Sequence, residues 1–475
     1  HETEKIICKA YETVLGKERV GLDDNFFEHG GDSLMAVQLL TEIEVGLSLQ
    51  PGELEYDSLY HYPTPTLLAD KLFNNKEEEE QFPIDTLDYT GIDDYLEKHQ
   101  NEKPEKKNLG NVLLTGVTGY LGIHILMDLL SRPEICGHIY CLSRPKGKLS
   151  AEKRVKTALY YYGVKDYSKI FEEKCEVMEG DITTPRSFVP LYDKSLDTII
   201  NTAANVAHFA YNDALKETNV DGVDSLLYLA RRTGATLCHI STISVGGTMK
   251  DCPPDMVFTE ADFYRGQNMT NAYIYSKYLA EYHMLRAATN QGVKIKIFRV
   301  GNLQGRRSDG EFQMNLKTNA FTRQLSSYIK MGAIPESLEK SAVNFSPVDD
   351  TAHRIVSLAA TDDSAMVFHV YPPQEVPYSK LLSALESCGH KVRILPDDEF
   401  EELFESMKRT KNGRVKIEGL LTERPKPGCC FIPVTQKTTN AILQTLNESW
   451  PEFTEEYLNC YIKALDGLNM FEEVD

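Results

Sequence analysis

A tyrosine and a lysine four residues apart, Tyr273 and Lys277, are the side chains best spaced for proton transfer. In a helix this spacing puts both on one face, whereas Tyr275 falls out of register with the lysine. A neighbouring ammonium lowers the pKa of a phenol, so Tyr273 is the predicted proton donor. Upstream, Thr242 follows an apolar run that starts at Leu237, where its hydroxyl could orient a carbonyl. We therefore expect Thr242, Tyr273 and Lys277 to act together on a carbonyl group.

A glycine-rich turn follows a short apolar run at residues 111–115 and opens a helical pattern that continues to Leu130. Glycines let backbone N–H groups approach a pyrophosphate closely, and a helix N-terminus adds the positive end of its dipole. A strand before the turn and a helix after it predict a dinucleotide-binding site. The residues of this turn expected to contact the dinucleotide are Thr115, Gly116, Thr118, Gly119, Tyr120, Leu121 and Gly122.

The end of the second predicted strand, residues 139–142, indicates which dinucleotide binds. Sites that prefer NAD place a carboxylate about 20 residues after the glycine turn, to hold the ribose hydroxyls. Here the strand is followed instead by Arg144, which could bind a 2′-phosphate through charge-assisted hydrogen bonds. Lys146, Lys148 and Arg154 keep the neighbourhood basic. The sequence therefore predicts NADPH rather than NADH, with an exposed basic loop as the competing interpretation.

Two further strand ends could line the cofactor. Asp181 and Ile182 follow one of them and could border the adenine. The small residues Ala203, Ala204 and Asn205 follow the other, although packing alone could explain the alanines. We expect no metal site.

Short apolar strands alternate with helical stretches from residue 111 to about residue 305. The predicted strands are residues 111–115, 139–142, 177–179, 198–201, 237–241 and 295–299. This alternation is typical of an α/β fold with a Rossmann-type, doubly wound parallel sheet. We assign residues 84–305 to this NADP-binding part. Residues 306–475 are expected to form mostly a smaller C-terminal substrate-binding subdomain, with a return to the sheet near residues 346–360.

The N-terminal 75 residues contain short helical patterns and a distinctive run from Phe26 to Leu34, in which two glycines and an aspartate precede Ser33. This run resembles the peptidyl and acyl carrier proteins of nonribosomal peptide synthetases, although these carriers more often have an apolar residue at the position of His29. The resemblance implies an all-α, four-helix carrier domain at residues 1–75 with phosphopantetheine attached to Ser33. A helix N-cap is the alternative role for this serine. Four consecutive glutamates, 77–80, predict an acidic linker at residues 76–83.

Bulk composition excludes several classes of protein. The formal net charge of -20 argues against nucleic-acid binding, which needs clustered Lys and Arg. The 10 cysteines form no C-x-x-C pair and predict reduced thiols in a cytoplasmic protein. No apolar run approaches the ~18 residues of a membrane span. Because the first residue is His1, we expect a piece of a longer protein.

Together, the glycine turn and the Thr–Tyr–Lys pattern resemble the extended short-chain dehydrogenase/reductase family. More narrowly, residues 84–475 resemble the thioester reductase domains that end peptide synthetases, and also those of carboxylic acid reductases and fungal aminoadipate reductase. Supporting stretches are residues 201–211, 215–220, 299–303 and 346–350. The resemblance implies that Asn219 supports the catalytic geometry and that Val300, Gly301, Asn302 and Leu303 lie near the nicotinamide. Relatives often carry proline in place of Val300.

The two resemblances imply reductive release, in which a thioester on the arm of Ser33 is reduced with NADPH to an aldehyde, or further to an alcohol. Tyr273 and Thr242 would hydrogen-bond the thioester oxygen, and Lys277 the nicotinamide ribose. The implied partners are upstream adenylation and condensation modules and a phosphopantetheinyl transferase, without nucleic acid or membrane. The alternatives are cyclising release without redox chemistry, an NADPH sensor without turnover, and a fragment of a carboxylic acid or aminoadipate reductase. A sugar-nucleotide epimerase would share the sheet but not the carrier.

Replacing Ser33 by alanine should abolish loading by a phosphopantetheinyl transferase, because the serine hydroxyl is the predicted attachment point. Intact-protein mass spectrometry after incubation with coenzyme A and the transferase measures the mass of the arm. The control Ser48→Ala, which changes a serine outside the run, should load like the wild type. An arm on the Ser33→Ala protein would contradict the carrier assignment.

Overall fold

The structure is a computed structural model that describes residues 2–31, 33–50, 53–54, 58–74, 82–206, 213–314, 319–423 and 430–471. Its N-terminal part contains the four helices expected of a carrier: α1 (Glu2–Leu15), α2 (Ser33–Leu47), α3 (Ser58–His61) and α4 (Pro65–Asn74). Most of the predicted acidic linker, residues 76–83, lies outside the described residues.

The carrier core forms around Tyr11 and Phe26, which are fully buried and meet edge to face with ring centroids 5.4 Å apart. A Cβ at Gly31 would lie 2.4 Å from the Phe26 ring, and Gly30 has a φ of +96°. The glycine pair is therefore required for the chain to pass the aromatic core and enter α2 at Ser33. The backbone of Ser33 begins that helix, while its side chain is outside the described part.

A seven-stranded sheet with the order β12-β7-β5-β4-β1-β2-β3 organises the rest of the chain. Every neighbouring pair is parallel. Its strands are β1 (Val112–Thr115), β2 (Ile139–Ser143), β3 (Cys175–Glu179), β4 (Thr198–Asn201), β5 (Thr236–Thr242), β7 (Ile295–Val300) and β12 (Val367–Val370). The predicted Rossmann-type fold and its six predicted strands are confirmed, with strand ends shifted by at most two residues.

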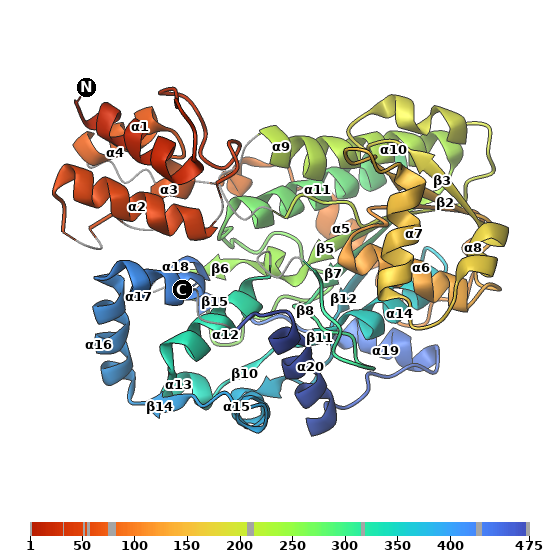
Figure 1. Ribbon diagram of the computed structural model, residues 1–475. Helices are drawn as coiled ribbons and strands as arrows, with labels where there is room; N and C mark the ends of the chain where they lie inside the picture. Colours follow the sequence, from red (N-terminus) through yellow and green to blue (C-terminus); the bar gives the residue numbers. More distant parts are fainter. Residues whose placement is uncertain are drawn as a thin grey trace.

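Helices cover both faces of this sheet (Figure 1). One face packs against α6 (Tyr120–Ser131), α7 (Ala151–Tyr162), α8 (Ser168–Lys174), α14 (Val348–Ala359) and α19 (Lys437–Thr445). The other packs against α5 (Ile92–Lys98), α10 (Gly222–Thr233) and α11 (Ala272–Gln291), with the 3-10 turns η1 (Ile84–Thr86) and η2 (Pro185–Leu191). Side chains alternate between these faces along each strand, as in β1, where Val112 and Leu114 face α6 and Leu113 faces the opposite core.

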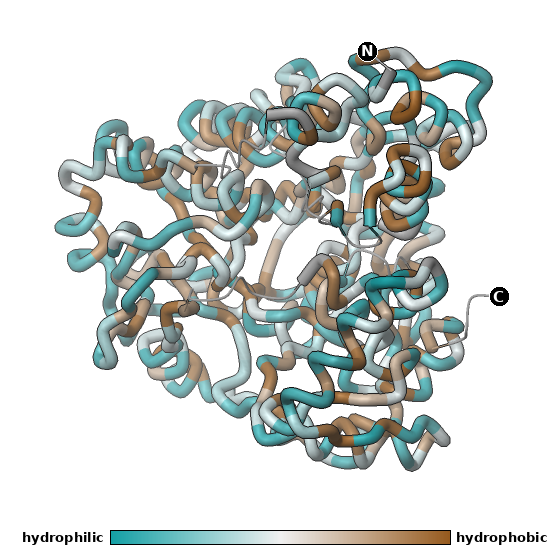
Figure 2. The backbone as a smooth tube through the Cα atoms, turned by 90° about the vertical axis from the view of Figure 1, so that its left-hand side faces the viewer, coloured by the Kyte–Doolittle hydropathy of each residue, from teal (hydrophilic) through white to brown (hydrophobic). Residues whose placement is uncertain are grey.

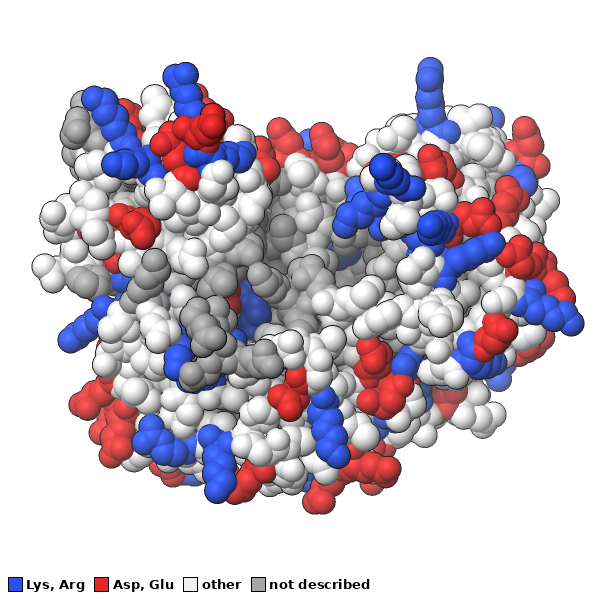
Figure 3. All heavy atoms as spheres, in the orientation of Figure 1, with Lys and Arg blue, Asp and Glu red and all other residues white. Residues whose placement is uncertain are grey.

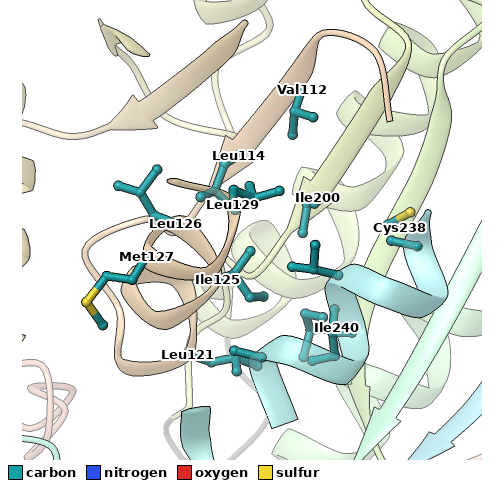
Figure 4. Packing of buried hydrophobic residues seen from close by; sticks show 14 of the residues in the cluster. Val112, Leu114, Leu121, Ile125, Leu126, Met127, Leu129, Ile200, Cys238 and Ile240 are labelled. Atoms are coloured by element: carbon teal, nitrogen blue, oxygen red, sulfur yellow. The ribbon is translucent and has the colours of Figure 1, made fainter. Parts of the chain in front are cut away.

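Figure 4 shows the first of these cores, where Ile125 and Leu129 of α6 lie beside Leu114 and Ile200 of the sheet. Full burial of each such side chain contributes about 1.5–3 kcal/mol to folding. This packing fixes the helix that starts at the glycine turn. The alternation of brown and teal along the tube in Figure 2 shows the same amphipathic pattern along the chain.

The seventh strand, β12, comes from residues that the sequence assigned to the substrate-binding part. Its residues Val367–Val370 pair with Ile297–Val300 of β7. The expected return to the sheet near residues 346–360 consists of α14, which packs on the sheet face, and β12 follows it. A four-residue strand that includes His369 and follows no glycine motif gives little sequence signal, so its place in the sheet depends on the pairing with β7.

The remaining elements form short two-stranded pairs and helices around the carboxyl edge and the C-terminal subdomain. The strands are β6 (Thr248–Met249), β8 (Leu303–Gln304), β9 (Ala333–Pro335), β10 (Ala342–Val343), β11 (Ser346–Pro347), β13 (Val376–Pro377), β14 (Arg393–Leu395) and β15 (Cys430–Phe431). The helices are α9 (Asp213–Lys216), η3 (Glu217–Asp221), η4 (Ile243–Gly246), α12 (Ala320–Met331), α13 (Glu336–Glu339), α15 (Tyr378–Ser387), α16 (Asp397–Lys408), α17 (Lys411–Lys416), α18 (Glu418–Glu423) and α20 (Glu455–Gly467). Among the residues described, no helix is both long and apolar enough to cross a membrane.

Candidate active site

The glycine turn brings the β1–α6 connection against the loop that follows β4. Gly116 has a φ of +67°, and a Cβ there would lie 2.4 Å from the backbone nitrogen of Ala203. A Cβ at Gly122 would lie 2.3 Å from the carbonyl oxygen of Gly116. No side chain among the described residues caps the start of α6 at Gly119, so the first amides of this 12-residue helix are open to a ligand. This close approach and these open amides fit a pyrophosphate group.

The side chains of Thr115, Tyr120 and Leu121 make contacts within the protein, so these residues would contact a cofactor through their backbone groups. Thr115 donates a hydrogen bond to the side-chain oxygen of Asn201 (2.6 Å). The Tyr120 hydroxyl bonds the carbonyl oxygens of Gln304 and Glu311, at 3.1 and 3.0 Å. Leu121 belongs to the core under the sheet.

Arginine side chains connect the glycine turn to the loop after β2. Arg154 donates to the Thr118 hydroxyl (3.3 Å) and to the carbonyl oxygen of Arg144. Arg144 itself is exposed, and its guanidinium lies 3.3 Å from a carboxylate oxygen of Asp181. In Figure 3, basic side chains gather at the upper right of the molecule, over α7. Asp181 therefore partners Arg144, and the exposed guanidinium is accessible to a phosphate.

The predicted lining residues differ in how much of each side chain faces the open edge of the sheet. Ile182 is buried in the core beside Gly222. Ala203, Ala204 and Asn205 are half-buried in the loop after β4, and residues 207–212 beyond them lie outside the described residues. The residues of the β4 loop thus keep accessible surface next to the glycine turn, while Ile182 acts through packing.

Asn219 lies in η3, a short π-helical segment, and is 1% exposed. Its amide group exchanges hydrogen bonds with the backbone of Asn205, at 2.7 and 2.8 Å. It also donates to Ser276 (2.8 Å), whose hydroxyl bonds the carbonyl oxygen of Tyr273. Asn219 therefore links the β4 loop to the first turn of α11, and π-helical turns are frequent at functional sites.

Thr242 lies at the end of β5, and the neighbouring helix α11 carries Tyr273 and Lys277. Thr242 is the last residue of β5 and is half-buried. Asn271 caps α11, which places Tyr273 and Lys277 one turn apart on it. Lys277 donates to the carbonyl oxygen of Ile240 (2.6 Å), two residues before Thr242.

The charge states at this site differ from the sequence expectation. Burial raises the pKa of Tyr273 to about 12. Burial also lowers the pKa of Lys277 to about 8, with Glu281 acting in the opposite direction. The expectation that the Lys277 ammonium lowers the Tyr273 pKa was therefore wrong for this structure, because the amine is bonded to Ile240 and both groups are desolvated.

The segment after β7 closes the same edge of the sheet. Val300 is buried at the end of β7. A Cβ at Gly301 would lie 2.4 Å from the side-chain oxygen of Asn344, which accepts a hydrogen bond from the Asn302 amide (3.0 Å). Leu303, half-buried, begins β8. Within the described residues, no group of three or more His, Cys, Asp or Glu is arranged to hold a metal ion.

Sequence reasoning missed two buried polar networks behind the catalytic residues. In the first, His239 bonds Asn201 and faces Lys277. In the second, Arg299 of β7 forms a bidentate, fully buried ion pair with Glu281 of α11. Both join residues of different strands or helices, so only strand order and helix placement could have revealed them.

The carrier contacts the C-terminal subdomain through the second half of α2, which lies above α17 and α18 in Figure 1. Arg414 of α17 forms a 2.7 Å ion pair with Glu44 of α2 and donates to Thr41 (3.3 Å). Val415 and Leu421 pack against the carrier core. Because Arg414 and Glu44 are 6% and 2% exposed, the pair is shielded from solvent and depends on both partners being present.

Fold and site together define a carrier domain joined to an NAD(P)H-dependent thioester reductase. The chain belongs to the family described as Male sterility protein, which matches residues 114–355. The description Phosphopantetheine attachment site matches residues 5–72.

Known proteins of similar sequence and structure agree with this assignment. The chain is similar to the structure of a thiolation-reductase di-domain from an archaeal non-ribosomal peptide synthetase, with 33% identity, a TM-score of 0.85 and coverage of 99% of this chain and 98% of that one. The Aureusimine biosynthetic cluster reductase domain matches 80% of this chain and 96% of its own, with 28% identity and a TM-score of 0.67.

Two longer relatives contain similar regions. A linear gramicidin synthase polypeptide of Brevibacillus parabrevis is 27% identical over 95% of this chain and 9% of its own length. The L-2-aminoadipate reductase large subunit of Candida glabrata is 26% identical over 86% of this chain and 31% of its own. The chain thus spans less than a third of the length of these two relatives.

Replacing Arg144 by alanine should weaken NADPH binding about 10- to 100-fold and leave NADH binding nearly unchanged. Losing one charge-assisted hydrogen bond to the 2′-phosphate costs about 1.5–3 kcal/mol. The two dissociation constants can be measured by the fluorescence of bound nicotinamide. The control Lys153→Ala removes the same charge from an exposed position of α7 and should preserve the preference. Equal weakening of both cofactors would remove Arg144 from phosphate recognition.

Replacing Arg414 by glutamate should release the carrier from the C-terminal subdomain, because it places two carboxylates in a shielded contact. Breaking such a pair costs about 3–5 kcal/mol. Small-angle X-ray scattering should show a larger radius of gyration, and the double variant Glu44→Arg with Arg414→Glu should restore compactness. The control Arg409→Glu changes an exposed arginine nearby. An unchanged radius of gyration in the Arg414→Glu protein would contradict the interface.

Proposed function

We propose that this chain releases an acyl or peptidyl group, held as a thioester on phosphopantetheine at Ser33, by reduction with NADPH. The observation that carries the proposal is the presence, in one chain, of a carrier domain and a reductase with Thr242, Tyr273 and Lys277 at one sheet edge. The similarity to a thiolation-reductase di-domain and to an aminoadipate reductase supports it.

In this proposal, Thr242 and Tyr273 hydrogen-bond the thioester oxygen and stabilise the negative charge that develops there. With a pKa raised to about 12, Tyr273 keeps its proton at neutral pH and can donate it. Bound NADPH supplies the hydride to the carbonyl carbon. Lys277 holds the nicotinamide ribose, and Asn219 fixes the first turn of α11 through Ser276.

The carrier contacts made by Arg414 lie in the second half of α2, at Thr41 and Glu44. Thr41 and Glu44 lie roughly 12–17 Å along α2 from Ser33 at 1.5 Å per residue. The arm can therefore extend from the start of α2 while the end of the helix stays docked. Tethering raises the effective concentration of the thioester at the reductase, which accounts for carrier and enzyme sharing a chain.

The partners implied by this function are upstream adenylation and condensation modules, together with a phosphopantetheinyl transferase. After hydride and proton have been added, the C=O bond re-forms as the C–S bond breaks, the hydroxyl proton passes to the sulfur, and an aldehyde separates from the pantetheine thiol. A second round of hydride and proton transfer would give an alcohol. Cyclising release without redox chemistry is the second candidate, and the presence of both Tyr273 and Lys277 counts against it.

The activity can be tested with NADPH and an acyl-pantetheine thioester, by following nicotinamide absorbance and trapping the carbonyl product for mass spectrometry. The wild type should oxidise NADPH and yield an aldehyde or an alcohol. Tyr273→Phe should bind NADPH normally but turn over about 10²–10⁴-fold more slowly, because the proton donor is gone and the fold is kept. Tyr275→Phe, two residues along α11, is the control and should stay close to the wild type. Wild-type turnover in Tyr273→Phe would remove this residue from the mechanism.

A further inference from the structure

A buried chain of hydrogen bonds runs from β1 through β4 and β5 to the catalytic lysine. Thr115 donates to the side-chain oxygen of Asn201 (2.6 Å), and the Asn201 nitrogen lies 3.0 Å from Nδ1 of His239. Nε2 of His239 lies 3.5 Å from Nζ of Lys277. All four side chains are at most 3% exposed, so each of their polar groups depends on the next for a partner.

The orientation of Asn201 is fixed by a backbone group that cannot reverse. The side-chain oxygen of Asn201 accepts from the N–H of Ala203 (3.2 Å) as well as from Thr115. A backbone N–H can only donate, so the oxygen of Asn201 must face Ala203 and its NH₂ group must face His239. That NH₂ group donates to Nδ1 of His239, which makes Nδ1 the acceptor.

The tautomer of His239 follows from this arrangement. Burial lowers the pKa of His239 well below its usual range, so the ring is neutral. A neutral imidazole with Nδ1 as acceptor carries its proton on Nε2. His239 therefore presents an N–H to Lys277 and offers it no acceptor.

A donor facing Lys277 favours the uncharged amine. A neutral amine can accept a hydrogen bond from Nε2–H while it donates one to the carbonyl oxygen of Ile240. An ammonium has no lone pair to accept with, so its N–H groups would face the N–H of His239 without a hydrogen bond. Among the residues that the structure describes, the other titratable groups near Lys277 are Tyr273, which is protonated, and Glu281, whose two carboxylate oxygens both bond Arg299. The pKa of Lys277 is accordingly lowered, to about 8, mainly by burial.

We propose that His239 is a positioning residue whose Nε2–H disfavours the ammonium form of Lys277 in the free protein, and that cofactor binding favours that form by offering acceptors to it. The proposal rests on the function proposed above, in which Lys277 binds the nicotinamide ribose. The ribose hydroxyls supply the acceptors that His239 withholds, so the ammonium is more strongly favoured in the complex than in the free protein. Above about pH 8, where free Lys277 loses its proton, cofactor binding is then coupled to proton uptake by Lys277.

The sign of the pH effect follows from linkage. The pKa of Lys277 is higher in the complex than in the free protein, so binding is fully supported below the free-state value and weakens as pH rises above it. The dissociation constant of NADPH should be flat from pH 7 to about 8 and then rise by up to about tenfold per pH unit. The pH range of this rise lies above the second pKa of a phosphate group, near 6, so phosphate ionisation does not cause it.

We call the pH at which the NADPH dissociation constant starts to rise the break. Two substitutions should move this break in the same direction. In Asn201→Asp, the carboxylate accepts from Nδ1–H of His239, which reverses the tautomer and turns Nε2 into an acceptor for the ammonium. In His239→Gln, the amide oxygen can face Lys277. Either change stabilises the ammonium in the free protein, so the break should move up by about one pH unit or more.

The experiment measures NADPH dissociation constants by nicotinamide fluorescence from pH 7 to pH 10 in the full chain, with proton uptake by calorimetry in two buffers. Cys238→Ala is the matched control, because Cys238 precedes His239 on β5 and packs on the opposite face of the sheet. It should keep the wild-type break. A wild type without a break, or both substitutions leaving it unmoved, would overturn the role of His239. Absence of NADPH binding at every pH would instead overturn the proposed function and this inference with it.

Discussion

The register of three adjacent parallel strands, β1, β4 and β5, is the constraint on which the site depends. Thr115 pairs with Asn201, and Asn201 pairs with His239, so the three side chains lie at one level across the sheet. A shift of one residue would turn Asn201 to the other face and break its hydrogen bonds to Thr115 and His239. The same register ends β5 at Thr242 and β1 at the glycine turn, which places Thr242 and the turn at one edge of the sheet, where we propose catalysis and cofactor binding.

Burial then sets the chemistry of the groups that the register aligns. Desolvation raises the pKa of Tyr273, which keeps its proton, and lowers the pKa of Lys277, which binds its proton less tightly. Asn219 connects the start of α11 to the β4 loop. The Arg299–Glu281 pair joins β7 to α11 one turn beyond Lys277, and Ser241 also donates to Glu281. A buried pair of this kind is costly to break, so it holds the helix and the strand ends in a fixed relation.

The carrier adds a second level of positioning, which works through tethering and a shielded ion pair. Arg414 contacts the second half of α2, and Ser33, the proposed attachment residue, begins the same helix. In the proposed function, the carrier stays docked through the end of α2 while a flexible arm on Ser33 reaches the reductase.

The sequence by itself determined the class of the fold and indicated the proposed site residues, since both depend on short-range patterns. The glycine turn lies between a strand and a helix, the Tyr273–Lys277 spacing matches one helical turn, and the Phe26–Leu34 run precedes α2. Three features were decided only by the tertiary structure: β12 as the seventh strand, the chain from Thr115 to Lys277, and the Arg414–Glu44 contact. Each joins residues far apart in sequence through strand order or packing of separate elements, which local periodicity does not specify. The charge of Lys277 likewise depends on burial and on the His239 tautomer, and both arise only when the sheet is assembled.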